Sequence, residues 1–141
     1  MRGWRPVATV MVAVCLLLAG CVSEWERRMQ ALRDDPMASA SWEGLDLLGT
    51  VETSNDSYKS PSPRITRCYK LGVSLKEAFE KAKETAWQYG WVTNADVKTA
   101  DYFEADKTVN GSWVVLRLAT ESPYCDNSYP DTEFTVMLVD Y

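Results

Sequence analysis

Two alternating segments on either side of Asn110-Gly111 form the clearest pattern in the chain. Asn-Gly favours a two-residue type I′ turn, so these segments predict a β-hairpin with its turn at 110–111. The turn sets the register, in which Val109 faces Ser112 and Phe103 faces Leu118. The apolar face, expected to pack under a helix, carries Phe103, Ala105, Val109, Val114, Leu116 and Leu118. The opposite face carries Tyr102, Glu104, Asp106, Thr108, Trp113, Val115 and Arg117.

Residues 75–89 show the apolar spacing of an amphipathic helix. Ser74 is a good N-cap residue, Glu77 completes a capping box, and Gly90 can end the helix. Further strands are predicted at 64–71 and 133–140, with a short one at 50–53. The strand at 133–140 is apolar on both faces, which favours a central position.

These elements predict an α+β fold: an antiparallel sheet of about four or five strands with one main helix (75–89) packed on one face. The polar, proline-rich segment 54–63 predicts a mobile loop. The domain is expected to span residues 50–141.

The first 20 residues have the three-part layout of a secretory signal. Arg2 and Arg5 form a positive start, and segment 7–18 is apolar apart from one threonine. This apolar run is shorter than a permanent membrane span of about 20 residues. The motif that follows, Leu18-Ala19-Gly20-Cys21, resembles the lipobox of bacterial lipoproteins.

The lipobox resemblance implies cleavage after Gly20 and a diacylglycerol group on Cys21, with acyl chains such as palmitate. Two or more acyl chains give stable membrane attachment. The expected location is extracytoplasmic, lipid-anchored to the cell membrane. Val22 stands where an aspartate retains enterobacterial lipoproteins at the inner membrane, so in a Gram-negative organism we expect the outer membrane.

Residues 21–49 are expected to form a lipidated tether with a short helix. Ser23 and Glu26 form a capping box, and Trp25, Met29 and Leu32 share one helical face. This face has two alternatives: packing on the domain, which we favour, or contact with lipid headgroups.

Cys68 and Cys125 are the two cysteines left after the signal and the lipid site are set aside. An oxidising compartment favours a disulfide between them. The alternatives are two buried free thiols or, less favoured, a catalytic dithiol, which usually has C-x-x-C spacing.

The composition of the chain argues against several further classes of function. The chain has no histidine, which removes the commonest general base and metal ligand. After residues 1–20, 13 basic and 20 acidic residues give a net charge of −7, which argues against nucleic-acid binding. We therefore expect no enzyme activity, no cofactor and no metal.

Two groups of acidic residues offer alternatives to this expectation. Asp101, Glu104 and Asp106 resemble a catalytic carboxylate cluster, but a solvated face paired with Arg117 is the favoured interpretation. The oxygens of Asp126, Asn127, Asp131 and Glu133 do not follow the spacing of a calcium loop.

The candidate binding surface consists of Tyr102, Trp113 and Val115, because exposed aromatic residues on a sheet suggest a partner surface. The alternative is that residues 36–49, with Trp42 and Leu45, cover this face. The sequence thus favours a membrane-anchored, non-catalytic adaptor or inhibitor domain that binds another envelope protein. A small-ligand-binding lipoprotein is the alternative, and a hydrolase using carboxylates alone is the least favoured hypothesis.

The mature chain also resembles small lipoproteins of unassigned function from high-GC Gram-positive bacteria. The shared features are Asp35-Pro36, the polar segment 54–63 and Gly90-Trp91. This resemblance implies a location and assigns no residue a role.

Overall fold

A computed structural model describes residues 20–56, 61–94 and 101–141. Nearly all of the predicted signal therefore lies outside the described residues, as do positions 57–60 of the predicted mobile loop. No helix within the described ranges is long and apolar enough to cross a membrane.

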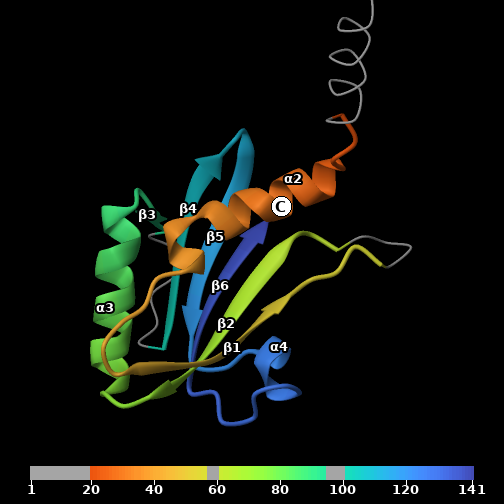
Figure 1. The fold of residues 1–141 in the computed structure, drawn as a ribbon. Helices are drawn as coiled ribbons and strands as arrows, with labels where there is room; N and C mark the ends of the chain where they lie inside the picture. Colours follow the sequence, from red (N-terminus) through yellow and green to blue (C-terminus); the bar gives the residue numbers. More distant parts are fainter. Residues whose placement is uncertain (1–19, 57–60, 95–100) are drawn as a thin grey trace, which may run out of the picture.

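The core of the fold is a six-stranded antiparallel sheet (Figure 1). In spatial order its strands are β1 (Leu45–Glu52), β2 (Arg64–Leu71), β6 (Phe134–Asp140), β5 (Ser112–Ala119), β4 (Tyr102–Val109) and β3 (Val92–Thr93). The α+β class is confirmed, and so is the central place of the last strand. The sheet has one strand more than the upper end of the predicted four or five, because the return segment after the main helix forms the two-residue strand β3.

The hairpin has the predicted register throughout, from Val109 opposite Ser112 to Tyr102 opposite Ala119. Asn110 and Gly111 both have positive φ angles, 48° and 84°, as a type I′ turn requires. Turn chemistry and side-chain alternation therefore specify the same pairing.

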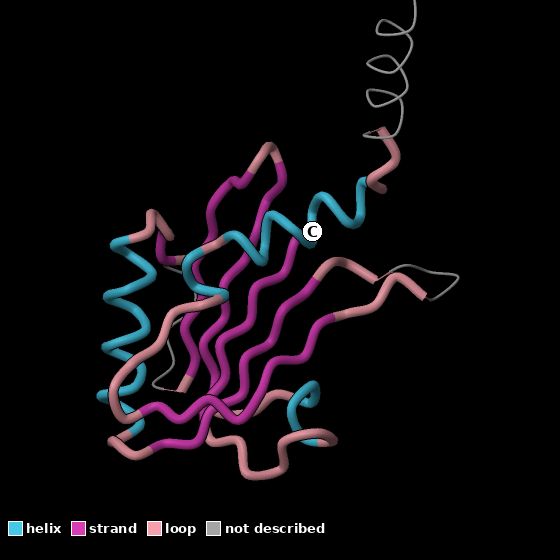
Figure 2. Tube along the Cα trace, in the orientation of Figure 1, coloured by secondary structure: helices cyan, strands magenta, loops and turns pink. Residues whose placement is uncertain are grey.

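Helix α3 (Leu75–Gln88) is the predicted main helix and packs on one face of the sheet (Figure 2). The Ser74 side chain accepts a hydrogen bond from the Glu77 amide. At the other end Gly90 has a φ angle of 83°, which lets the Trp91 amide bond back to the Ala86 carbonyl. Trp91 is buried as a result.

Helix α2 (Glu24–Asp34) and the short 3-10 helix η1 (Pro36–Ala38) pack on the same face as α3. Met29, Leu32 and Met37 are fully buried in the core. Ion pairs hold both ends: Arg28 to Asp140 at 2.6 Å, and Lys107 to Asp35 at 2.5 Å. The favoured alternative for the short helix, packing on the domain, is therefore confirmed, and α2 and η1 contribute to the core.

Strand β1 is longer than the predicted 50–53 and begins at Leu45. A register shift between Leu47 and Gly49 inserts one extra residue, which breaks the alternation that sequence analysis looks for. Before β1, the Trp42 indole donates to the Thr85 hydroxyl of α3. Trp42 and Leu45 thus pack on the helix side and leave the opposite sheet face uncovered by segment 36–49.

A disulfide joins Cys68 of β2 to Cys125 of helix α4 (Pro123–Asp126), as predicted. Both sulfur-bearing residues are fully buried. The bridge fastens the segment before β6 to the sheet face opposite α2 and α3. There the Tyr129 ring lies directly on Gly49, whose missing side chain leaves the necessary space.

Candidate binding surface

Within the described residues, the sheet face opposite α2 and α3 is open over β4 and β5. It presents Trp113 with 55% of its surface exposed, and Tyr102 partly exposed. The third predicted residue, Val115, lies on the same face but is only 2% exposed. Val115 therefore cannot contact a partner directly.

Tyr141 is the surface residue that sequence analysis missed. Its amide donates to the Trp113 carbonyl, and its ring centroid lies 6.1 Å from that of Trp113. The Arg117 guanidinium lies 5.7 Å from the Tyr141 ring. Tyr141 is 54% exposed and, with Trp113, forms an aromatic pair beside the buried Val115. The alternation of β6, continued one residue beyond Asp140, would have placed Tyr141 on this face.

Next to the aromatic pair, a polar network surrounds Glu104. The carboxylate accepts hydrogen bonds from Arg117 Nε at 2.9 Å, Tyr102 Oη at 2.8 Å and Asn94 Nδ2 at 3.2 Å. Burial raises the pKa of Glu104, but the hydrogen bonds from Arg117 and Tyr102 outweigh it, so the pKa is lowered. Burial and the bond to Glu104 raise the pKa of Tyr102 to about 12.

This network fits the favoured interpretation, a polar face paired with Arg117, rather than a catalytic carboxylate cluster. Glu104 is paired with Arg117, as the register indicated, while Asp101 is exposed at the start of β4. A carboxylate with a lowered pKa is a poor general acid near neutral pH. This arrangement suits a fixed surface charge better than acid–base chemistry.

The acidic residues of the loop before β6 do not converge either. Glu133 Oε2 accepts a hydrogen bond from the Leu71 amide at 2.8 Å, which uses this carboxylate to close the end of β2. Across the described ranges, no three potential ligand side chains gather into a metal site.

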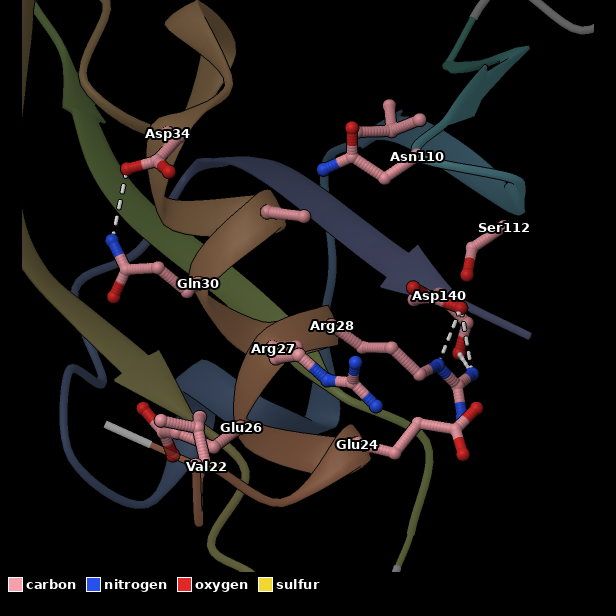
Figure 3. A pocket seen from close by; sticks show the side chains of 13 residues that line it. Val22, Glu24, Glu26, Arg27, Arg28, Gln30, Asp34, Asn110, Ser112 and Asp140 are labelled. Atoms are coloured by element: carbon pink, nitrogen blue, oxygen red, sulfur yellow. Dashed lines mark hydrogen bonds and ion pairs between the residues drawn. The ribbon is translucent and has the colours of Figure 1, made fainter. Parts of the chain in front are cut away.

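Apart from this surface, an open groove of about 890 Å³ lies between α2 and the β4–β5 turn (Figure 3). Charged and polar side chains predominate in its lining, which includes Glu24, Arg27, Arg28, Asn110, Ser112 and Asp140. The Asp140 side chain is only 1% exposed, and Arg28 donates two hydrogen bonds to its Oδ1, at 2.6 and 3.0 Å. These bonds fasten α2 to the end of β6.

Cys21 is exposed, and its thiol is free in the described part of the chain. It lies two positions before Ser23, which caps α2 by accepting a hydrogen bond from the Glu26 amide. In comparisons with known proteins, no family model, curated protein or solved structure matches this chain. The surface described above is therefore the basis for assigning a function.

Proposed function

We propose that this protein is an extracytoplasmic lipoprotein, anchored through Cys21, whose domain binds another envelope protein without catalysing a reaction. The observation that carries the binding role is the exposed Trp113–Tyr141 pair on the sheet face opposite α2 and α3. Tryptophan, tyrosine and arginine are the residue types most enriched in interface hot spots, and Arg117 adjoins the pair.

The lipid anchor is supported by the signal layout, the lipobox and the accessible Cys21. The buried Cys68–Cys125 disulfide fits an oxidising compartment outside the cytoplasm. Metabolic labelling with a palmitate analogue in the native organism tests the anchor. We expect the label in the wild-type chain and its loss in Cys21→Ser, whereas label retained by that variant would contradict lipidation at this residue.

The binding role is tested by capture from detergent-solubilised envelope of the native organism. The bait is the mature chain, residues 21–141, with Cys21→Ser to keep it free of lipid. Trp113→Ala is the test variant. Trp87→Ala is the matched control, because Trp87 is 50% exposed but lies on α3, on the other side of the sheet.

A partner held by the wild-type bait and by the Trp87 variant should be lost with the Trp113 variant. Truncating a hot-spot residue costs about 2 kcal/mol or more, which weakens binding by roughly 30-fold. A partner that binds all three baits equally would place the interface elsewhere, and the absence of any specific partner would contradict the adaptor role.

A further inference from the structure

The distance between the proposed lipid site and the folded domain is very short. Only Val22 separates Cys21 from the helix cap Ser23. Two residue steps span at most about 7 Å of extended chain. A lipid on Cys21 would therefore hold the first turn of α2 at the headgroup surface.

Helix α2 cannot swing away to lengthen this connection. Met29 and Leu32 are buried in the core, and Arg28 is bonded to the nearly inaccessible carboxylate of Asp140. The orientation of α2 therefore fixes the orientation of the whole domain. Whatever lies beside the first turn of α2 must also lie near the bilayer.

The β4–β5 turn lies at this end of the molecule. In Figure 1 the start of the described chain and the turn both point toward the upper end of the view. The open groove beside α2 is bordered by Gly20 and Val22 as well as by Asn110 and Ser112 of the hairpin (Figure 3). Trp113 is the next residue of β5, and Tyr141 pairs with it.

The chemistry of this end suits the boundary between lipid and water. Tryptophan and tyrosine prefer the headgroup region, where the ring is in a largely apolar layer and the polar atom stays hydrated. Trp113 and Tyr141 are each more than half exposed. Arg27 and Glu24 both line the groove nearby, so the local charge is mixed. It would neither attract nor repel charged lipid headgroups strongly.

We propose that the Trp113–Tyr141 pair is a membrane-contact site that rests in the headgroup layer of the bilayer to which Cys21 is anchored. This inference rests on the lipid anchor of the proposed function. It adds that the lipid surface covers the end of the open face nearest the anchor. A protein partner embedded in the same membrane then meets the side of the pair that the lipid leaves free, together with Tyr102 and Arg117.

The test uses the lipidated mature chain, purified from membranes and reconstituted into vesicles whose phospholipids carry bromine on the acyl chain close to the headgroup. Bromine quenches tryptophan emission at contact distance. Trp25 lies in the first turn of α2 and would itself be quenched, so the comparison is made in a Trp25→Phe background. Within it, Trp113→Phe is the test variant, Trp87→Phe is the control of similar exposure, and the background chain serves as the wild type. Flotation of the vesicles on a density gradient reports separately whether the chain is anchored.

We expect all three chains to float with the vesicles. Brominated lipid should quench the wild-type chain and the Trp87 variant, and this quenching should fall by more than half in Trp113→Phe. Quenching that is equal in all three chains, or lost only with Trp87→Phe, would overturn the membrane-contact site while leaving the anchor intact. A chain that does not float would overturn the anchor and the contact site together. Failure of the protein-binding role alone would appear only in the capture experiment, with flotation and quenching as expected.

Discussion

Replacement of Leu32 by alanine tests whether α2 belongs to the folded domain, on which the orientation at the membrane depends. Leu32 is 1% exposed and lies in the core cluster with Met29 and Met37. The change removes three carbon atoms, which at about 0.8 kcal/mol per buried methylene gives about 2.4 kcal/mol. The cavity left behind adds to this, so we expect a total loss of about 3 kcal/mol.

Urea unfolding of the mature chain, followed by tryptophan emission, measures this loss. The midpoint should fall with little change in the slope, because the surface exposed on unfolding is nearly the same. Arg27→Ala is the control on the same helix. Arg27 is exposed, so its replacement should change the free energy of unfolding by less than about 0.5 kcal/mol.

A small loss of stability in Leu32→Ala would instead mean that α2 does not pack on the sheet. On a helix that merely tethers the domain, Leu32 would be solvated and alanine would be a slightly better helix former. A loss below about 1 kcal/mol, or one no larger than that of Arg27→Ala, would therefore refute the packing of α2. It would also remove the physical basis for a fixed orientation at the bilayer.

Three further predictions concern other parts of the domain. Replacing both Cys68 and Cys125 by alanine opens a loop with a sequence separation of 57 and should cost about 4 kcal/mol in urea unfolding; a loss below about 1 kcal/mol would contradict a stabilising bridge. Gly49→Ala should cost about 1–3 kcal/mol, since its new methyl group would overlap the Tyr129 ring, and most of this cost should vanish in a Tyr129→Ala background. Folding lowers the pKa of Glu104 from 4.5, so the ionised carboxylate stabilises the fold above pH 4.5, and this stabilisation is lost as the pH falls through the pKa of the folded state. The melting temperature of the wild type should therefore fall more steeply with acidification than that of Glu104→Gln. Equal slopes for the two proteins would contradict this prediction.

The elements predicted best are those whose signals are local. Asn110-Gly111 requires positive φ angles at both positions, and the flanking alternation independently demands the same register. Ser74 and Gly90 mark the two ends of α3 in the same way, through groups that bond within one helical turn. Such signals need no knowledge of distant contacts, and the structure agrees with them closely.

The N-terminal half of the domain was harder to predict because distant residues determine it. The apolar stripe of α2 has the same sequence pattern whether it meets a sheet or a membrane. The contact that shows which it meets, Arg28 with Asp140, joins residues 112 positions apart. The extra residue in β1 likewise breaks its alternation between Leu47 and Gly49 and concealed the first half of that strand.

The candidate surface shows the same limit at the level of single side chains. Alternation correctly placed Trp113 and Val115 on one face, but it says nothing about which neighbours shield them. Val115 is 2% exposed, whereas Trp113, two residues away on the same face, is 55% exposed beside Tyr141. Facing direction is thus a local property of a strand, whereas exposure depends on the strands on either side.

The proposed short connection through Cys21 to the bilayer changes how strong the proposed binding surface needs to be. A domain held against the membrane in one orientation has already lost much of its translational and rotational freedom, so it loses less on meeting a partner in the same membrane. Confinement to one surface also raises the effective concentration of the partner. The part of the open face beyond the lipid contact, around Tyr102, Glu104 and Arg117, is small and partly polar. A surface of that kind would bind weakly in solution, yet it can hold a neighbour that shares its membrane, so affinity measured on common vesicles should exceed affinity measured in detergent.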